Sequence, residues 1–498
     1  MPERRTAVAD LGSNSFRLVV FGTHTEGWWT KADEIHETVR IGAGIGDSGK
    51  LGRKAVTRAL ETIELFRAFC DATDVAEVDA VATSAVRDAT NRDELLERSA
   101  LPVRVLSAEE EAWFGYVAAV NSTTLVDGAV LDIGGGSMQL VEVSGRHARH
   151  RASWALGAVR MTERFLPDAG PPSKKQVKAL RAHVREQLAG ADWFGGGHLV
   201  GIGGAIRNLA AAAERAHEFP FPGVQGFALR RGALGELVDA LADRPARKRG
   251  GISGIKPGRA DIILAAAIVV QEVMDIGGYD ALEATEWGLR EGVYMAGELA
   301  PSDPPLLGDV REAAVRNLAI RYQGTLDHPE QVRRLALDLW DGLAAAGVHP
   351  GDPGERALLA DAALLHDIGM AVNYDDHHKH SRYLIIRSGL PGFSPREVGL
   401  LAQMARYHRK GDPGPDDLSA LMRDGDDELL ERCAAILRVV EQLERARDGR
   451  VRDIEVRPRD GVIELALDAR ADVSFARWAA ERQAPLFEQA FGHPLALA

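Results

Sequence analysis

The sequence predicts an α/β fold built from two duplicated halves, followed by an all-α region and a small α+β tail. A hairpin motif occurs twice, apolar runs alternate in strand and helix periods over residues 1–300, and amphipathic helices dominate after the segment APSDPP at 300–305. At 498 residues the chain is too long for a single core. We therefore expect four domains, over residues 1–126, 127–300, 307–446 and 447–498.

The repeated motif is a strand, a glycine-containing turn and a returning strand. Residues 10–19 read DLGSNSFRLV and align without a gap on residues 132–141, which read DIGGGSMQLV. Five of the ten positions are identical, and one of them is the aspartate. Two unrelated hairpins that both need glycine and serine are the alternative, but the shared charged position favours duplication.

The first half is predicted to follow the order βββαβαβα. We expect three strands within residues 5–42, the last ending at Arg40-Ile41, and then elements in the order helix 52–72, strand 78–83, helix 93–98, strand 103–106 and helix 108–120. This order resembles the subdomain of the actin, sugar-kinase and heat-shock ATPase superfamily (a ribonuclease H-like fold). Because that superfamily is built from two such halves, the repeat at Asp132 is expected to start a second βββαβα core.

The remaining elements follow from the same periodicities. The second half should contain strands to about Val159, a helix at 173–187, a strand at 198–202 and helices at 259–273 and 289–299. Beyond it we expect helices at 329–345, 356–367, 395–408 and 427–447. In the tail, strands at 454–456 and 462–465 flank Asp460-Gly461, which is typical of a hairpin turn, and a final helix begins near Val473.

Bulk properties narrow the class of protein. The net charge of −13 argues against a general nucleic-acid or membrane binder, and the longest apolar run, at 262–270, is far too short for a bilayer span. Cys70 and Cys433 are the only cysteines and lie in different predicted domains, so no disulfide framework is expected. We predict a cytoplasmic enzyme.

The two hairpins carry the residues of a candidate phosphate site. Amides of the turn at 134–136 are uncovered by side chains and suit a phosphate oxygen. Asp10 and Asp132 end their strands and could hold the divalent cation that accompanies phosphate. Each aspartate could instead only cap its turn, but its paired occurrence in a duplicated fold favours the metal site.

Other polar residues could complete that site. Glu109, Glu110 and Glu111 open a helix that Ser107 is expected to cap, and acidic residues are favourable there in any case. One of them could instead deprotonate a water molecule for attack on phosphorus. Arg87 follows a strand end and could bind phosphate with two hydrogen bonds, and the glycine turn at 201–205 starts another helix, where an anion is favoured.

A second constellation lies in the helical region. Seven of the 15 histidines fall there, namely His328, His349, His366, His377, His378, His380 and His408. His366-Asp367, with His328 at an earlier helix start, resembles an HD-type metal site, whose closing aspartate would here be replaced by Glu441. Imidazole and carboxylate ligands suit a transition metal or magnesium. Structural or surface histidines in a relic of that fold are an equally weighted alternative.

Longer motifs identify a family resemblance that covers nearly the whole chain. They are ADLGSNSF at 9–16, TSA at 83–85 with Arg87, LS at 106–107 with EEA at 110–112, DIGGGS at 132–137, RAD at 259–261, GLREG at 288–292, LHDIG at 365–369, HKHS at 378–381, LPGFS at 390–394 and RYHRK at 406–410. The chain resembles the exopolyphosphatase / guanosine pentaphosphate phosphohydrolase (Ppx/GppA) family, in its long form with a C-terminal HD-like domain.

The resemblance implies hydrolysis of a terminal phosphoanhydride bond in inorganic polyphosphate or guanosine pentaphosphate, assisted by Mg²⁺. Glu111 is the expected general base, Arg87 and Asp132 are further catalytic candidates, and Asp10, Asp132 and Gln139 are the candidate metal ligands. The candidate phosphate-binding residues are Ser13, Asn14, Ser15, Gly134, Gly135, Gly136, Ser137, Gly203 and Gly204. The candidate ligands of a possible second divalent metal, in the HD-like domain, are His328, His366, Asp367, His380, His408 and Glu441.

Two departures from the family pattern leave alternatives open. The family places glutamate where this chain has Gln139, and a hydroxyl residue where it has Ala205. A catalytically weakened polyphosphate- or alarmone-binding regulator is therefore an alternative, and an ATP-dependent kinase of the actin-like superfamily is a third. Arg230, Arg231, Lys256 and Arg259 could follow a long polyanion or form a solvated basic surface. We expect a homodimer, with neither nucleic acid nor a membrane as partner.

Overall fold

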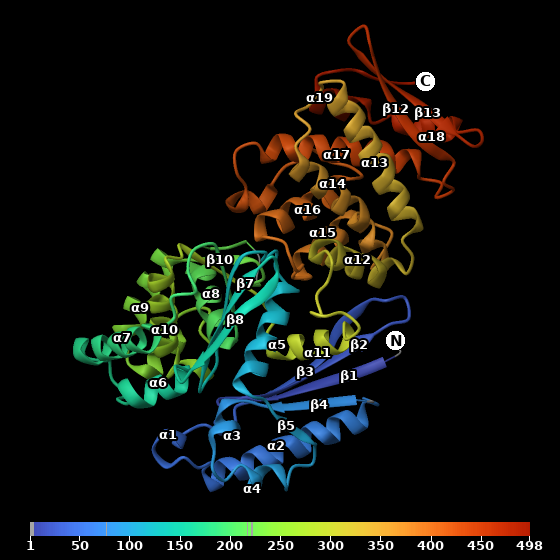
Figure 1. Ribbon diagram of the computed structural model, residues 1–498. Coiled ribbons are helices and arrows are strands. Elements are labelled where there is room, and N and C mark those ends of the chain that lie inside the picture. The colour runs from blue at the N-terminus through green and yellow to red at the C-terminus, as the bar shows by residue number, and fades with distance from the viewer. Residues whose placement is uncertain (1–3, 76, 217, 221–222) are drawn as a thin grey trace. The chain divides into compact units, whose positions relative to one another are not determined.

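The computed structural model describes residues 4–75, 77–216, 218–220 and 223–498, which divide into two compact units (Figure 1). Unit 1 holds the described residues up to Phe219 and from Gly223 to Val310, and unit 2 holds Arg311–Ala498. The finer division into four domains stays a prediction. Among the described residues, no helix combines the length and the apolar character that a membrane crossing requires.

Unit 1 contains two sheets that share a five-stranded topology, to which the second sheet adds an antiparallel strand, β10. The first has the order β3-β2-β1-β4-β5, and the second has the order β10-β11-β9-β6-β7-β8. In each, three antiparallel strands are followed by strands that run parallel to the first, so β6, β7, β8, β9 and β11 repeat β1 to β5. The predicted duplication is confirmed. The strands are β1 (Arg4–Leu11), β2 (Phe16–Thr23), β3 (Trp29–Glu37), β4 (Glu77–Ala82), β5 (Val103–Val105), β6 (Gly128–Ile133), β7 (Met138–Ser144), β8 (His147–Trp154), β9 (His198–Ile202), β10 (Phe227–Arg230) and β11 (Ala281–Ala284).

The two hairpins have the same register as well as the same sequence pattern. Asp10 pairs with Arg17 across β1 and β2, and Asp132 pairs with Gln139 across β6 and β7. Four residues, 12–15 and 134–137, connect the strands in both. The repeated aspartates therefore end equivalent strands of the two sheets.

Helices cover the sheets of unit 1 and join them. They are α1 (Ile45–Ser48), α2 (Arg53–Ala72), α3 (Ser84–Asp88), α4 (Asp93–Leu96), α5 (Ala108–Val120), α6 (Ala158–Phe165), α7 (Lys174–Leu188), α8 (Gly204–Ala216), α9 (Arg231–Ala242), η1 (Ala246–Gly251), η2 (Pro257–Arg259), α10 (Ile263–Gly277) and α11 (Leu289–Glu298). One face of α2 packs against the first sheet and buries Val56, Ile63 and Phe66. Each such side chain contributes about 1.5–3 kcal/mol on burial.

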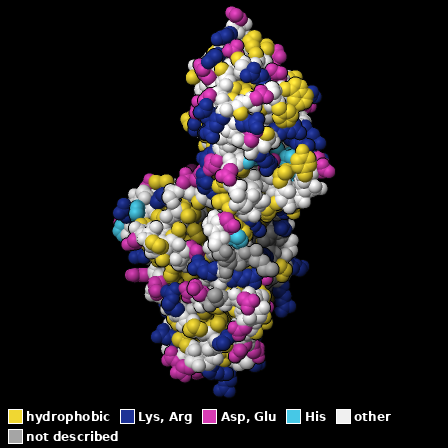
Figure 2. Space-filling model, turned by 90° about the vertical axis from the view of Figure 1, so that its right-hand side faces the viewer, with side chains coloured by type: hydrophobic (Ala, Val, Ile, Leu, Met, Phe, Trp, Pro, Cys, Tyr) yellow, Lys and Arg dark blue, Asp and Glu magenta, His cyan; other side chains and the backbone are white. Residues whose placement is uncertain are grey.

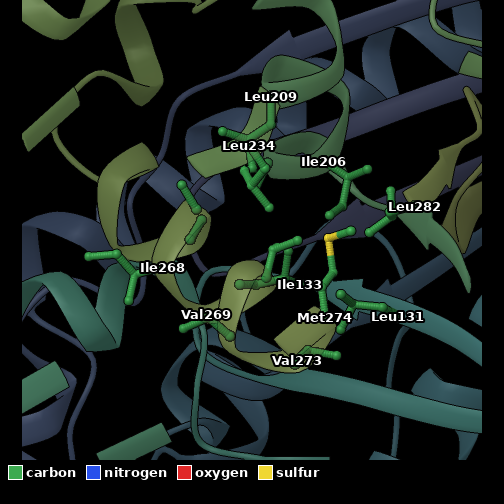
Figure 3. Packing of buried hydrophobic residues seen from close by; sticks show 14 of the residues in the cluster. Leu131, Ile133, Ile206, Leu209, Leu234, Ile268, Val269, Val273, Met274 and Leu282 are labelled. Carbon is green, nitrogen blue, oxygen red and sulfur yellow. The ribbon is translucent and has the colours of Figure 1, made fainter. Parts of the chain in front are cut away.

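The second sheet packs against α8, α9 and α10. Figure 3 shows Ile206 and Leu209 of α8, Leu234 of α9 and Ile268 of α10 in one apolar cluster with Leu131 of β6. Helix α10 is apolar on most sides because it is buried on most sides. This core fixes β6 and the start of α8, which carry site residues.

Helices α5 and α11 share a third core with the inner faces of both sheets. It includes Val8 and Val19 of the first sheet and Val130 and Val200 of the second. Gly292 of α11 lies so close to α5 that a Cβ there would be 1.9 Å from the carbonyl oxygen of Phe114. Helix α11, which we expected to close the second half, therefore also holds the first half in place.

The third strand is shorter than predicted. It ends at Glu37 rather than at Ile41, and Arg40 adopts a positive φ of 53°. Val39 and Ile41 are buried, which reproduces the alternation of a strand. The backbone amides of Arg40 and Gly42 instead donate to the carbonyls of Asn14 and Ser13, and so support the first hairpin loop.

Unit 2 is a helical bundle followed by a three-stranded sheet. Its elements are α12 (Val310–Gln323), α13 (Asp327–Ala345), α14 (Pro353–Leu365), η3 (Ile368–Ala371), α15 (His377–Arg387), α16 (Pro395–Tyr407), η4 (Asp416–Leu421), α17 (Asp426–Leu443), β12 (Val451–Arg459), β13 (Val462–Ala469), α18 (Ser474–Glu481), α19 (Ala484–Phe491) and β14 (Leu495–Leu497). The predicted tail hairpin is present, and Asp460 and Gly461 both have positive φ at its turn. The sequence did not predict α12 or α15, whose mean polarity hides their packing face.

Candidate functional site

A cleft of about 100 Å³ in unit 1 brings together residues from both hairpins. Of the predicted site residues, those that line it are Asp10, Ser13, Asn14, Ser15, Glu111, Asp132, Gly134, Gly135, Gly203 and Gly204. Arg87, Gly136, Ser137 and Gln139 are not among its lining residues. Arg87 and Ser137 instead contact Glu111, and Gly136 contacts Ser84.

Glu111 is the one glutamate of its triplet that is buried. Glu110 forms a capping box with Ser107, in which each side chain accepts a hydrogen bond from the other residue's amide. Glu109 and Glu110 are exposed, whereas Glu111 is 6% exposed and faces the cleft. Arg87 donates to Glu111 Oε2 at 2.8 Å, and Ser137 Oγ lies 3.5 Å from Oε1. Of the three consecutive glutamates, Glu110 therefore caps the helix and Glu111 lines the cleft.

The electrostatic environment favours proton uptake at the cleft carboxylates. Burial raises the pKa of Glu111, and Arg87 opposes this only in part. Burial and the neighbouring Glu111 raise the pKa of Asp132 to about 7. Burial also raises the pKa of Asp10, against the opposing charges of Arg290 and Arg17. A carboxylate with a raised pKa is suited to accept a proton from water near neutral pH.

Glycines allow the loops of the two halves to touch. Ser13 Oγ and Ser84 Oγ, both from the first half, lie 3.0 Å apart in a hydrogen bond. A Cβ on Gly136 would lie 2.5 Å from Ser84 Oγ, and one on Gly135 would lie 2.9 Å from Ser13 Cβ. Only residues without a side chain permit this approach, which closes one end of the cleft.

The third glycine loop packs directly behind Asp132. Gly203 has a φ of 95°, and a Cβ there would lie 2.7 Å from Asp132 Oδ1. Helix α8 begins at Gly204, so its first amides open at the cleft, where a negative charge is favoured. Ala205 is buried, at 1% exposure, in the core below this loop.

Four arginines line the cleft, and sequence reasoning did not recognise them as a group. Arg17 lies on β2, Arg207 on α8, Arg259 in η2 and Arg290 on α11. Burial and the charge of Arg290 lower the pKa of Arg207 to about 10, while burial, Arg17 and Arg207 lower that of Arg259 to about 10. Arg290 Nη1 lies 3.8 Å from Asp10 Oδ2. Like charges that depress each other's pKa in a buried cleft form a site for a highly charged anion.

The other basic residues expected to follow a polyanion are spread more widely. Arg259 lines the cleft, but Arg230, Arg231 and Lys256 do not. Arg231 instead lies 3.2 Å from Asp280 in an exposed ion pair. Arginines far apart in the sequence, rather than local basic runs, therefore make the cleft positive.

Gln139 is buried below the second hairpin loop, with 1% of its surface exposed. Its Nε2 donates to Ser137 Oγ at 2.8 Å and to Ser153 Oγ at 3.1 Å. Its Oε1 is buried and has no hydrogen-bond partner among the described residues. An unused carbonyl oxygen on the residue paired with Asp132 is a suitable ligand for a hard cation.

The second candidate site lies within unit 2. His328, His366, Asp367 and Glu441, four of the residues predicted as metal ligands, place their ligand atoms within 4.8 Å of one another, and metal binding there stays a prediction. Asp367, His377 and His408 form a second such group, which shares the aspartate. Across the part of the chain that the structure describes, the predicted ligand His380 belongs to neither group. His377, one turn earlier on α15, takes part in the second group instead.

The histidines of these two groups differ in pKa. Burial opposes protonation of His366, but Asp367 and Glu441 outweigh it and raise its pKa to about 9. Burial and the charge of His366 lower the pKa of His408 to about 4. His349, another of the seven histidines, contacts the Trp340 carbonyl and the Gly351 amide and has a structural role.

Known proteins resemble this chain along most of its length. A model of the Ppx/GppA phosphatase family matches residues 22–300, and a model of domain III of that family matches residues 310–477. The guanosine-5'-triphosphate,3'-diphosphate pyrophosphatase of Vibrio vulnificus is 27% identical over 448 residues, which are 86% of each chain.

Solved structures extend this result to the fold. The Ppx/GppA family member of Aquifex aeolicus is 29% identical with a TM-score of 0.53, covering 60% of this chain and 99% of that one. An exopolyphosphatase of Cytophaga hutchinsonii shares the fold at 24% identity and a TM-score of 0.55, covering 59% of this chain and 97% of that one. The chain therefore belongs to the Ppx/GppA phosphatase family.

Proposed function

We propose that unit 1 is an exopolyphosphatase, which releases terminal phosphate from inorganic polyphosphate by water attack in the cleft. The observation that carries the proposal is the arrangement of four arginines around the half-buried carboxylates Asp10 and Asp132 and the buried carboxylate Glu111. Cations bind and neutralise the phosphate groups, while a carboxylate is needed to accept the proton of the attacking water.

Glu111 has the role of general base in this proposal. Its raised pKa suits proton uptake, and Arg87 and Ser137 hold its two oxygens in place. Arg87 acts as a positioning residue, because its guanidinium donates hydrogen bonds to Glu111 and to the carbonyl of Leu106. The hairpin-loop amides and the four arginines bind the phosphates on either side of the bond that breaks.

Magnesium fits the oxygen donors in the cleft and below its second hairpin loop. Asp10, Asp132 and the unpaired Oε1 of Gln139 are hard oxygen donors, and Mg²⁺ is usually bound by one or two carboxylates together with substrate phosphates and water. When bound, the ion would neutralise charge on the phosphate oxygens. In the described part of the chain, the cleft carboxylates do not form a close group of three, so substrate oxygens are expected to complete the coordination.

Guanosine pentaphosphate is the second candidate substrate. It is favoured by the match to the Vibrio vulnificus enzyme over 86% of both chains, because that enzyme is named for guanosine-5'-triphosphate,3'-diphosphate. Phosphate release from the two compounds, measured side by side, distinguishes them. The homodimer and the cytoplasmic location stay predictions.

Glu111→Gln tests the assignment of the general base. We expect loss of phosphate release from polyphosphate by more than about 100-fold, because the amide cannot accept a proton. Glu109→Gln is the matched control, since it removes an exposed glutamate from the same helix turn. Equal turnover of Glu111→Gln and the wild-type protein, with unchanged thermal stability in both, would contradict the proposal.

A further inference from the structure

We propose that unit 1 has a second anion-binding site outside the cleft, where Arg40 and Arg247 hold those phosphates of a long polyphosphate chain that are remote from the bond being cut. The site is a pocket of about 410 Å³. Arg40 reaches it from the first half of the unit, and its other lining residues, which lie between 246 and 261, come from the second half. The identity of the ligand rests on the function proposed for unit 1.

The cleft has room for only the end of such a chain. Its volume is about 100 Å³, whereas sites that enclose a whole small ligand usually measure about 300–1,000 Å³. Among the described residues that line it, none is aromatic, and nearly all are polar, charged or glycine. A long polyphosphate with its end in the cleft must therefore continue outside it.

Two segments of the chain line both the cleft and the outer pocket. In and beside η2, Arg259 lines the cleft, while Pro257 and Asp261 line the pocket. After β3, Arg40 lines the pocket, and its backbone amide donates to the carbonyl of Asn14, which lines the cleft. The outer pocket therefore adjoins the cleft on the side of Arg259.

Arg40 reaches the pocket through an unusual backbone conformation. Its φ is 53°, which residues other than glycine rarely adopt. In this conformation the amide binds the first hairpin loop, and the guanidinium extends to the second half, where Nη1 donates to Asp261 Oδ2 at 2.8 Å. Backbone outliers persist where the surrounding structure requires them, and they are frequent at ligand sites. The ion pair fixes a guanidinium at the edge of the pocket before a ligand arrives.

Asp261 does not cancel the positive charge of the pocket, because it also balances a buried arginine. Arg249 is 2% exposed and donates to the carbonyl of Leu241, which fixes η1 to α9. Burial lowers the pKa of Arg249, and the charge of Asp261 opposes that change. Asp261 Oδ1 is itself buried and accepts no hydrogen bond from a described residue. Three arginines, Arg40, Arg247 and Arg249, thus accompany one carboxylate.

Arg247 has no role in holding the fold together. It is exposed on η1, and it forms no hydrogen bond or ion pair within the described part of the chain. A guanidinium presents several N–H donors in a plane and binds phosphate oxygens in pairs. Arg247 and the prearranged Arg40 therefore give successive phosphates of one chain two places to bind.

Exposed positive charge alone does not distinguish this site. Figure 2 shows Lys and Arg side chains interspersed with Asp and Glu over the face of the molecule that it displays. Lys248 is an example, because it follows Arg247 on η1 and is exposed but does not line the pocket. Arg40 and Arg247 differ from such residues because they come from different halves and line one pocket beside the cleft.

Binding to the full-length Glu111→Gln protein tests the site independently of turnover. Calorimetry compares a long-chain polyphosphate with tripolyphosphate, which is short enough to be held by the cleft. Adding Arg247→Gln should raise the Kd for the long chain, relative to the Kd for tripolyphosphate, by about 10-fold, because a charge-assisted hydrogen bond is lost. Lys248→Gln, which removes one charge from the same turn, is the control and should leave the ratio unchanged. An unchanged ratio in Arg247→Gln overturns the proposal.

Kinetics with an otherwise wild-type chain test the role in the reaction. In Arg247→Gln the KM for the long chain should rise by about 10-fold relative to that for tripolyphosphate, and the change should appear in KM rather than in kcat, because the pocket does not touch the reacting atoms. If the wild-type protein releases phosphate from neither compound, the function proposed for unit 1 fails, and the binding series alone decides on the outer site.

The Arg40–Asp261 ion pair has a competing explanation, in which it only holds the two halves together. Arg40→Gln would then lower the melting temperature and weaken the binding of both ligands alike, while Arg247→Gln would change nothing. That result overturns the proposal, which expects both substitutions to weaken the long chain more than tripolyphosphate. Because Arg247 makes no contact that the fold needs, the test holds even if Arg40→Gln unfolds.

Free orthophosphate is the other source of the same chemistry. If the released product occupies the pocket, orthophosphate should bind the Glu111→Gln protein saturated with tripolyphosphate, and Arg247→Gln should abolish that binding without changing the affinity for the long chain. This outcome overturns the role of the pocket in holding substrate. Competition between orthophosphate and the long chain, with both weakened by Arg247→Gln, supports it.

Discussion

At the scale of single residues, burial decides which of several similar side chains can act. Successive residues of a helix point about 100° apart, so only one of Glu109, Glu110 and Glu111 can face the cleft. Glu110 closes the capping box and Glu111 meets Arg87. The charge of the triplet is local, but its chemistry depends on the position of each glutamate around the helix.

Gln139 provides a test of how charge beside Asp132 affects metal binding. In Gln139→Glu the hydroxyl of Ser153 can turn to donate to the new carboxylate, whereas that of Ser137 can do so only by leaving Glu111 Oε1. The added charge opposite Asp132 should lower the Mg²⁺ concentration for half-maximal phosphate release by about 10-fold. Mg²⁺ titrations of polyphosphate hydrolysis measure this. An unchanged midpoint excludes Gln139 from the metal environment.

The sequence predicted most cleft residues but not their complete set. The hairpin residues were found because they repeat within one chain and need no tertiary information. Arg207 and Arg290 carry no such local pattern, since their meaning arises when α8 and α11 meet at the cleft. His377 and His380 lie one turn apart on the same face of α15. Sequence spacing alone therefore does not show which of the two lies beside Asp367.

At the scale of elements, α11 connects the packing of the two sheets of unit 1 with the cleft. It packs between the two sheets beside α5, and it carries Arg290 into the cleft. Sequence periodicity predicted the helix at nearly its observed bounds but assigned it to the second half alone. Periodicity identifies a buried face but does not identify what covers it.

Gly292→Ala should destabilise unit 1, because the added Cβ would lie 1.9 Å from the carbonyl oxygen of Phe114. The helices must separate, at a cost of about 2 kcal/mol or more. Polyphosphate turnover should fall as well, since Arg290 moves with the helix. Thermal unfolding and phosphate release measure the two effects.

Gly297→Ala on the same helix is the control. Nothing lies within 4 Å of a Cβ at Gly297, and alanine there should stabilise the helix by about 0.5–1 kcal/mol. If both variants unfold at the same temperature, the close contact of α5 and α11 is not what holds the two sheets.

At the scale of the whole molecule, a chain of net charge −13 concentrates positive charge in one small cleft. Arginines that line one small cleft repel one another, so they lower the stability of unit 1, and the proposed anionic substrate would offset that cost. The same contrast explains why the net charge argues against a general nucleic-acid binder but says nothing about the four arginines of the cleft.

Tripolyphosphate should raise the melting temperature of the Glu111→Gln protein by about 5 °C at saturating concentration. Arg259→Gln in that background should melt at the same or a higher temperature without ligand, because repulsion is relieved, and should show a smaller ligand-induced increase. Arg231→Gln, outside the cleft, should leave the increase unchanged. Scanning calorimetry decides, and equal increases in all three proteins contradict the role of the arginines.

The shared register of the two hairpins has a consequence for ancestry and for direction. A single-copy ancestor could have formed this cleft only by pairing with a second copy of itself, and its two walls would then have been equivalent. In the present chain Arg17 and Gln139 occupy matching positions, and Glu111 stands on one side only. A symmetric cleft would treat both ends of a bound chain alike. Under the proposed function, the divergence of the two copies would distinguish the end of the chain that is cut from the end that is held.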